Sequence, residues 1–445
     1  MNTFNGTLDI YLASAGCGKT HQLMNIIDYH LKNGVPIDRI AFVTFTRKGA
    51  EVAQLRVAEQ FGIDLKHLKN FRTIHSLAFR GCGASKDRMM DFAKYKDFGE
   101  KAGYDFGFLG LDAAEGIDWR EMKDQQLVTI EQLYRSNRKY CEQIMDDRVA
   151  FSDLTRYIQL YQKYKKTFGF MDFTDLLEEY IARGLTEDVD VVCLDEMQDS
   201  SPLQWQLVFQ AFSKAKHVYA VGDVKQAVFT YSGASADTLL NLKGTQHMLD
   251  TSYRVPSRIL DFAQHIVDEM QLTDHSKCKA VKDGGTVEEI TCLDELNSQF
   301  DIGKSYFFLA RNKKFFKQYE QWCRTNGIPY CIKGEPVFSD TDKMEFRDGK
   351  TDGWDPKKLD FARTCHSHGL FYARPNVNIS TIHTVKGDEA DVVVLMSDIS
   401  RAVDSQLEMD PDSEHRVFYV AVTRAKEKLI IVQPQTRMFY PYLLM

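Results

Sequence analysis

The sequence predicts an α/β protein built on parallel sheets, and three observations support this fold class. The chain of 445 residues is long enough for two or three domains with substantial cores. Short apolar runs typical of buried strands alternate with longer stretches in which apolar residues recur at helical spacing. Polar or glycine-containing turns follow several of these strands, at the carboxyl ends where open α/β sheets bind ligands. We therefore expect the functional residues to lie at strand ends.

The first predicted elements are a strand over residues 8–12 and a helix that follows residue 20, whose apolar face consists of Leu23, Ile26, Ile27 and Leu31. The turn between them, residues 13–20, is Ala-Ser-Ala-Gly-Cys-Gly-Lys-Thr. Such a turn lets backbone N–H groups converge on phosphate oxygens at a helix N-terminus. Lys19 can then reach the β- and γ-phosphates, and Thr20 can hold Mg²⁺. The alternative is a glycine-rich turn without a ligand, but Gly-Lys-Thr between a strand and a helix favours phosphate binding.

Two acidic residues end another buried strand, predicted over Val191–Leu194. Asp195 and Glu196 follow it directly. In a phosphoryl-transfer site the first acid would hold Mg²⁺ and the second would polarise the attacking water. Adjacent acids at a strand end can also form only a turn. The phosphate loop upstream favours the catalytic interpretation.

Further strands are predicted over residues 40–45, 217–221, 306–310, 392–396 and 429–432, with a helix over residues 315–325. Gln226 follows the strand at 217–221 and is placed to sense a γ-phosphate. Phe229 and Tyr231 alternate in a manner suited to stacking on bases, and Phe45 at the end of the strand at 40–45 could do the same. Taken alone, these aromatic residues would be assigned to the core.

Two segments interrupt this pattern. From residue 81 to 168 the strands disappear, and helices are expected near residues 126–145 and 151–167. This helical insertion carries a group of basic and aromatic residues: Arg135, Arg138, Lys139, Tyr161, Lys163, Tyr164, Lys165 and Lys166. A nucleic-acid backbone contact and a solvated helix face explain them equally well. Between residues 336 and 376 the chain is polar and irregular, and no regular element is expected there.

Composition narrows the function classes. The net charge of −7 does not indicate a nucleic-acid-binding protein, so any contact with nucleic acid must come from local basic patches. Nine scattered cysteines form no CxxC pair and the twelve histidines form no ligand-spaced cluster, which argues against a zinc or iron–sulfur site. The odd number of cysteines, with one thiol inside the phosphate loop, indicates a reducing compartment. No secretory or membrane-spanning segment is recognised in the sequence. We therefore expect a cytoplasmic protein with no membrane contact.

Ten short motifs occur in a fixed order along the chain: ASAGCGKT (13–20), TFTRKGAEV (44–52), FRTIHSLA (71–78), MDFTDLL (171–177), LDEMQDSSPLQ (194–204), VGDVKQAVFTYSGA (221–234), SYR (252–254), LARN (309–312), TIHTVKGDEADVVVL (381–395) and FYVAVTRAK (418–426). The ordered set resembles superfamily 1 DNA helicases of the UvrD/PcrA/Rep group. The resemblance spans nearly the whole chain and is very specific.

The resemblance implies two RecA-like P-loop domains with parallel sheets, using ATP and Mg²⁺. The N-terminal ATP-binding domain would comprise residues 1–80 and 169–250, interrupted by the helical insertion at 81–168. Residues 251–445 would form the C-terminal domain. In this group the second domain carries a large insertion, which here would be reduced to a loop or short segment at 336–376.

The resemblance also implies roles for individual residues. Lys19, Glu196, Gln226, Arg254 and Arg424 would be catalytic, the two arginines as arginine fingers. The nucleotide would be held by Ala15, Gly16, Cys17, Gly18, Lys19, Thr20, His21, Tyr253 and Glu389, and the magnesium ion by Thr20 and Asp195. The expected DNA contacts are Thr44, Phe45, Arg47, His75, Phe229, Tyr231, Arg311 and His383.

The implied activity is ATP-dependent translocation on single-stranded DNA, 3′ to 5′ by family precedent, with unwinding of tailed or forked duplex by a monomer. The reduced insertion suggests a need for a protein partner in processive unwinding. One alternative is a translocase on single-stranded DNA with little unwinding, and another is a subunit of a helicase–nuclease or of a repair or recombination complex. A DNA-binding scaffold without catalysis is a third. The nucleic acid that the protein moves along could also be RNA. The segment that carries an adenine-reading glutamine in the group has no counterpart here, which leaves the preferred base open.

Overall fold

The computed structural model describes residues 4–106, 124–144, 151–274 and 276–444 and separates into two compact units. Unit 1 comprises Met1–Ser252 and Gln271–Cys278, and unit 2 comprises Tyr253–Met270 and Lys279–Met445. The chain therefore leaves unit 1 after Ser252, returns to it for eight residues, and leaves it again. No local sequence pattern indicates this return, and the motifs predict a C-terminal domain that is continuous from residue 251.

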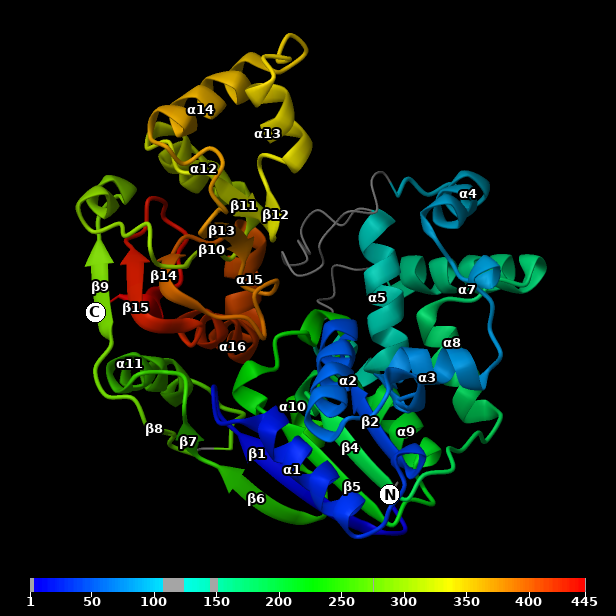
Figure 1. Cartoon of the computed structure of the whole chain (residues 1–445). Helices are drawn as coiled ribbons and strands as arrows, with labels where there is room; N and C mark the ends of the chain where they lie inside the picture. The colour runs from blue at the N-terminus through cyan, green and yellow to red at the C-terminus, as the bar shows by residue number, and fades with distance from the viewer. Residues whose placement is uncertain (1–3, 107–123, 145–150, 275, 445) are drawn as a thin grey trace. The chain divides into compact units, whose positions relative to one another are not determined.

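Unit 1 is organised around a six-stranded sheet in the order β3-β2-β4-β5-β1-β6, and all of its strand pairs are parallel (Figure 1). The strands are β1 (Thr7–Ala13), β2 (Ile40–Thr44), β3 (Phe71–Thr73), β4 (Val191–Asp195), β5 (His217–Gly222) and β6 (Thr245–Leu249). Every residue of β2 and β4 is buried, as expected for a parallel sheet covered on both faces. The predicted α/β class with parallel sheets is confirmed.

Helices cover both faces of this sheet: α1 (Lys19–Lys32), α2 (Arg47–Phe61), α3 (Ile74–Gly81), α8 (Phe173–Ala182), α9 (Pro202–Ala211) and α10 (Ala236–Leu240). Two separate hydrophobic clusters show the alternation of side chains along a strand. Phe42 of β2 packs in the cluster that holds Leu23 of α1. Its neighbours Ala41 and Val43 belong to the opposite cluster, with Trp205 of α9. The sheet is thus fixed from both sides, and its strand ends are rigid supports for functional residues.

The described residues of the segment at 81–168 include four α-helices: α4 (Phe92–Ala102), α5 (Asp124–Ser136), α6 (Arg138–Ile144) and α7 (Phe151–Phe168). The single helix expected near residues 126–145 is broken at Asn137, and Met145 lies outside the described residues. The Asn137 side chain explains the break, because it accepts the N–H of Tyr140 and donates to the carbonyl of Gly233. Tyr157, Tyr161 and Phe98 form a buried aromatic core in this subdomain. Tyr161 is therefore a core residue and not part of a surface patch.

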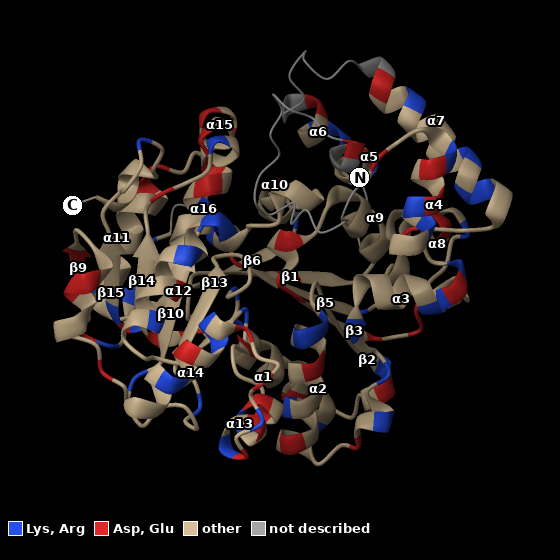
Figure 2. Cartoon of the chain, turned by 90° about the horizontal axis from the view of Figure 1, so that it is seen from above, with Lys and Arg blue, Asp and Glu red and all other residues tan. Residues whose placement is uncertain are grey.

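Two of the basic residues noted in this segment are buried in an ion network instead of facing nucleic acid or solvent. Arg135 contacts four carboxylates at distances of 2.6–3.2 Å. They belong to Glu131 in α5, to Asp172, which caps α8, and to Asp175 and Glu178 within α8. Lys165 of α7 contacts Asp172 and Asp175 at 2.6 and 2.7 Å. Burial raises the pKa of the Glu131 carboxyl to about 7. The network joins the helical insertion to α8, while Lys163 and Lys166 remain on the exposed face of α7, where Figure 2 shows basic residues.

Replacing Arg135 by alanine is expected to lower the free energy of unfolding by about 3–5 kcal/mol, because it leaves buried carboxylates without their partner. The matched control is Arg138→Ala. Arg138 forms an exposed pair with Glu142 on the same subdomain, and such a pair contributes at most about 1 kcal/mol. Denaturant unfolding of both variants measures the difference. Equal losses in the two variants would contradict the structural role assigned to the network.

Unit 2 contains a seven-stranded sheet in the order β12-β11-β13-β10-β14-β15-β9, parallel except for the β11–β12 pair. Its strands are β9 (Thr286–Ile290), β10 (Tyr306–Ala310), β11 (Tyr330–Ile332), β12 (Glu335–Pro336), β13 (Val377–Thr381), β14 (Ala390–Met396) and β15 (Ala425–Val432). Its helices are α11 (Ser257–Asp268), α12 (Phe316–Thr325), α13 (Asp340–Arg347), α14 (Pro356–Ser367), α15 (Arg401–Met409) and α16 (Pro411–Val422). The two-residue strands β7 (Thr251–Ser252) and β8 (Lys279–Ala280) lie where the chain passes from one unit to the other.

The expectation of an irregular segment at residues 336–376 is wrong, because α13 and α14 lie within it. Ser339 caps α13 in a reciprocal pair with Asp342, and Asp355 and Pro356 begin α14. Phe338, Phe361 and Phe371 pack in the same hydrophobic cluster as the sheet of unit 2. The segment is therefore a short extension of the unit's own core. None of the helices in the described residues combines the length and apolar character needed to cross a membrane.

Candidate nucleotide-binding site and aromatic cluster

The turn between β1 and α1 has the backbone conformation that a phosphate-binding loop needs. Gly16 and Gly18 have φ angles of 76° and 75°, in the left-handed region that glycine adopts without strain. Gly18 is the N-cap of α1, and the first turn of this helix carries no acidic residue. No acidic side chain of the helix's own first turn therefore opposes the positive potential at its N-terminus. An anion is the ligand that this arrangement favours.

Lys19, the first residue of α1, lies beside the acids at the end of β4. Its ammonium nitrogen is 3.0 Å from Oε1 of Glu196. Burial lowers the pKa of Lys19, but the negative charges of Glu196, Asp223 and Asp195 outweigh burial and raise it overall. Lys19 therefore stays charged at neutral pH. The structure brings together residues that lie 177 positions apart in the sequence.

The acids around Lys19 carry more negative charge than this lysine neutralises. Asp195 is buried, and burial together with the charge of Glu196 raises its pKa to about 7. Glu196 has a φ of 56° and is one of two non-glycine residues with positive φ in the described part of the chain. Such a backbone costs about 1–3 kcal/mol and is common at functional sites. A divalent cation suits this site, because Mg²⁺ is usually held by one or two carboxylates with phosphate oxygens and water. The described residues contain no larger cluster of three or more metal-ligating side chains.

A pair of glutamines connects the ends of β4 and β5. The Gln198 side chain is fully buried, donates to Oε2 of Glu196, and accepts the backbone N–H of Asp223 at 3.0 Å. Gln226 donates to Oδ2 of Asp223 at 2.5 Å. The sequence pointed to Gln226 but gave Gln198 no role. The position of Gln198, two residues beyond Glu196, could have indicated its role, because a polar residue there must find hydrogen-bond partners at the same strand end.

Three aromatic residues expected to contact DNA form one cluster in unit 1. The rings of Phe45 and Phe229 are stacked with centroids 5.1 Å apart, although 184 residues separate them in the chain. Tyr231 meets Phe229 edge-on at 6.0 Å. All three side chains are half-buried, so part of each ring faces solvent. We name Phe45, Phe229 and Tyr231 the aromatic cluster.

The other expected DNA contacts in unit 1 differ in exposure. Arg47 begins α2 and is exposed, whereas Thr44 is buried at the end of β2. His75 is half-buried and meets the ring of Phe173 edge-on at 5.5 Å. Burial lowers the pKa of His75 to about 4, so the imidazole is neutral at physiological pH. It can exchange a hydrogen bond with a phosphate but adds no positive charge.

The remaining expected site residues lie in unit 2. Tyr253 is 62% exposed, and Nε of Arg254 is 3.8 Å from Oε2 of Glu389. Arg424 is buried and donates to the carbonyls of Val420 and Asp388. Arg311 is held in a buried two-point ion pair with Glu414, at 2.7 and 2.8 Å, and His383 is also buried. An Arg311 contact with DNA would have to compete with Glu414.

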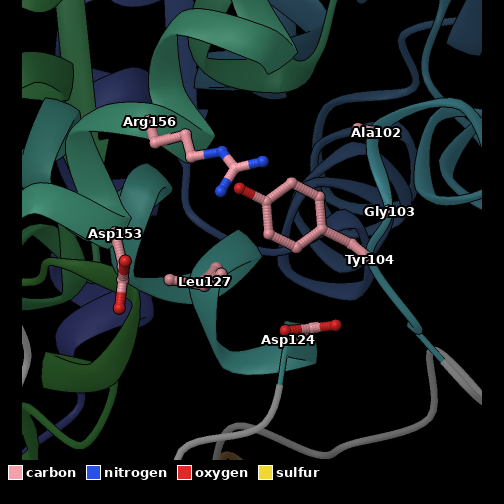
Figure 3. A pocket seen from close by; sticks show the side chains of 7 residues that line it. All are labelled: Ala102, Gly103, Tyr104, Asp124, Leu127, Asp153 and Arg156. Atoms are coloured by element: carbon pink, nitrogen blue, oxygen red, sulfur yellow. The ribbon is translucent and has the colours of Figure 1, made fainter.

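A separate cavity of about 190 Å³ lies in the helical insertion (Figure 3). Its lining includes Tyr104, whose ring lies beside the guanidinium group of Arg156, and the carboxylates of Asp124 and Asp153. Ligand pockets usually measure about 300–1,000 Å³, so this cavity is small for an organic substrate.

The sheet, the loop at its edge and the buried acids define the class: an α/β protein with a phosphate-loop architecture. Residues 1–247 match the model of the UvrD/REP helicase N-terminal domain, and residues 364–436 match that of the UvrD-like helicase C-terminal domain. The first match alone covers more than half of the chain. The chain belongs to the UvrD/REP helicase family, and the resemblance inferred from its motifs is confirmed.

Individual relatives are distant in sequence. A probable DNA helicase of Mycoplasma pneumoniae is 25% identical over 99% of this chain and 83% of its own length. The ATP-dependent DNA helicase Rep of Escherichia coli is 24% identical over 74% of this chain and 53% of its own length. The RecBCD enzyme subunit RecB of Mycolicibacterium smegmatis is 33% identical over 24% of this chain. The chain spans only about half the length of several relatives, including the Rep protein.

Proposed function

We propose that this protein is an ATP-dependent DNA helicase that moves 3′ to 5′ along single-stranded DNA and unwinds tailed or forked duplex. The observation that supports this most is the meeting of Lys19, Glu196 and Asp195 beside the phosphate loop, in the same unit as the aromatic cluster. One unit thus offers both a place for a triphosphate and a place for bases. Family membership supports the same assignment.

In the proposed reaction the loop residues 15–18, with His21, surround the phosphates, and Lys19 neutralises their β- and γ-oxygens. Thr20 and Asp195 would hold Mg²⁺, which when bound supplies charge neutralisation at the transferring phosphoryl group. Glu196 polarises the attacking water, and its positive-φ backbone fixes where its carboxylate points. Gln226 senses the γ-phosphate. The family resemblance assigns Arg254 and Arg424 as the finger cations and Tyr253 and Glu389 as nucleotide contacts.

The proposed track is single-stranded DNA lying on the aromatic cluster. Base–aromatic stacking contributes about 1–3 kcal/mol per base and tolerates any sequence. Separating a base pair costs about 1.4 kcal/mol in DNA stacking, so one or two such stacks are of the right size to offset it. Thr44, Arg47, His75, Arg311 and His383 complete the proposed contacts. Of these, Arg47 is the one that is plainly exposed and charged.

Phe229→Ala is expected to weaken single-stranded DNA binding about 5- to 150-fold, which is the loss of one base stack of about 1–3 kcal/mol. Phe229 touches both other members of the aromatic cluster, so its removal also loosens Phe45 and Tyr231. Fluorescence anisotropy with a labelled oligonucleotide measures the affinity. Tyr29→Ala is the control, because Tyr29 is an exposed aromatic residue near the C-terminal end of α1. Equal affinities for the Phe229 variant and the unmodified protein would show that the aromatic cluster does not bind single-stranded DNA.

The coarse assignment is tested by ATPase activity measured with and without oligonucleotides. We expect strong stimulation by single-stranded DNA and weaker stimulation by RNA, and the same assay with GTP in place of ATP measures which base the site prefers. Unstimulated hydrolysis would contradict a nucleic-acid motor. Equal stimulation by RNA would contradict the proposed specificity for DNA.

A second candidate is a motor subunit of a larger helicase–nuclease or repair complex, with little unwinding alone. The stretch shared with a RecB subunit favours it. The two family models leave residues 248–363 unmatched, and this range includes α13 and most of α14. The short segment at α13 and α14 also suits a protein that recruits a partner for processive unwinding. We propose that the chain is a monomer on its own. Size-exclusion chromatography with light scattering tests this point.

A further inference from the structure

The segment that returns to unit 1, Gln271–Cys278, lies against the phosphate loop, and we name it the return segment. Lys225 attaches it through a buried ion pair with Asp274 at 2.8 Å, in which both side chains are 2% exposed. The same ammonium donates to Oγ of Ser276 at 2.7 Å and to Oγ of Ser14 at 3.0 Å. Because Ser14 belongs to the phosphate loop, one lysine fixes the return segment and the loop to each other.

This attachment places two thiols in contact. Sγ of Cys17, in the phosphate loop, is 3.4 Å from Sγ of Cys278 in the return segment. The two cysteines are 261 residues apart in the chain, so their meeting is a product of the fold. Cys17 is buried, whereas Cys278 is half-buried and offers the route by which a small oxidant can reach the pair. Both are reduced in this structure.

The two thiols are not equivalent. The hydrogen bond with Cys17 and the charge of Lys225 lower the pKa of Cys278. The same hydrogen bond, with burial, raises the pKa of Cys17. Cys278 is therefore the nucleophile of the pair, since the thiolate is the reactive form. Cys17 is positioned to attack second.

We propose that Cys17 and Cys278 are a redox site at which a peroxide forms a reversible disulfide that closes the phosphate loop to nucleotide. The Cys278 thiolate attacks one oxygen of hydrogen peroxide, breaks the O–O bond and becomes a sulfenic acid, and the hydroxide released takes up a proton to form water. The Cys17 sulfur then attacks the Cys278 sulfur, and the S–O bond breaks with loss of a second water. Overall, two thiols and one peroxide give one disulfide and two waters. A thiol reductant reverses the change.

The consequence for the site rests on the proposed nucleotide-binding function. A disulfide needs its sulfurs about 2.05 Å apart, so the two sulfurs must approach each other by more than an ångström, and any part of this movement made by Cys17 displaces the phosphate loop. Cys17 lies between Gly16 and Gly18, whose backbones hold the loop in its phosphate-binding form. A shift of about 1 Å in a positioned group can cost about a hundredfold in rate. The loop thus stops holding phosphates without any change in Lys19 or Asp195.

The test treats the full chain with hydrogen peroxide and maps its disulfides by mass spectrometry of non-reduced peptides. We expect a Cys17–Cys278 cross-link and at least a tenfold loss of affinity for a fluorescent ATP analogue, both reversed by dithiothreitol. Cys278→Ser should bind nucleotide normally and resist the oxidant. Cys292→Ser is the matched control, because Cys292 is exposed and belongs to unit 2, outside the return segment, and this variant should remain sensitive.

Two results would overturn the proposal. One is oxidation that leaves Cys17 and Cys278 unlinked, for instance with Cys278 trapped as a sulfinic acid or a mixed disulfide. The other is a Cys278→Ser protein that loses nucleotide affinity under peroxide as fast as the unmodified chain. The cross-link is read independently of nucleotide binding. If the reduced protein bound no nucleotide at all, the proposed function would fail while the disulfide itself would still be measured.

Discussion

Lys19→Ala is expected to lower ATP hydrolysis by at least about a hundredfold while leaving single-stranded DNA binding intact. Lys19 is the cation nearest the acids of β4, and it is the residue that the site offers to the β- and γ-phosphates. The aromatic cluster lies on other elements and should keep its affinity for DNA. Steady-state ATPase rates and DNA anisotropy on the same preparation measure both effects.

The control for this variant is Lys32→Ala. Lys32 is in the same helix, α1, but its side chain is 74% exposed and pairs only with Asp28 one turn away. Its removal should change neither hydrolysis nor DNA binding. Hydrolysis that survives in the Lys19 variant would show that the phosphate loop has been wrongly assigned.

Arg254→Ala is expected to lower the hydrolysis rate by about 10³-fold or more, with nucleotide affinity nearly unchanged. An arginine finger acts on charge that develops in the transition state, so its loss affects the rate more than binding. Arg254 is a cleaner probe than Arg424. Arg424 is buried and donates to two backbone carbonyls, so its removal would also destabilise the fold.

Arg258→Ala provides the comparison for Arg254. Arg258 is exposed in the first turn of α11, four residues further along the chain. Thermal unfolding of both variants separates a catalytic loss from a folding defect. If Arg254→Ala hydrolyses ATP within fivefold of the unmodified rate, the finger role is wrong for this residue.

The parts of the site that could be predicted from the sequence are those in which a local pattern determines the position of a side chain. A buried apolar run places Asp195 at a strand end, and a small-residue turn before a helix places Lys19 at a helix N-terminus. Because parallel strands carry their carboxyl ends to one edge, the acids at that strand end lie near Lys19, whose ammonium contacts Glu196, the residue after Asp195. Their chemical roles are still proposals.

The parts that could not be predicted depend on contacts between distant segments. Nothing local in Lys225, Cys17 or Arg135 indicates that their partners are Asp274, Cys278 and the acids of α8. For the same reason Tyr161, Tyr164 and Lys165 of the insertion are buried, although they resembled part of a surface patch, whereas Lys163 and Lys166 are exposed. The helices α13 and α14 were missed because they are short and polar, although their capping residues were visible in the sequence.

We propose that ATP hydrolysis at Lys19 and Glu196 drives this chain along single-stranded DNA and separates the duplex ahead of it. Strand displacement on matched duplexes with a 3′ or a 5′ single-stranded tail tests it most directly. We predict ATP-dependent product from the 3′-tailed duplex, little from the 5′-tailed duplex, and none with Lys19→Ala. Product that forms equally well without ATP or with Lys19→Ala, or no product from either tail, would contradict the account.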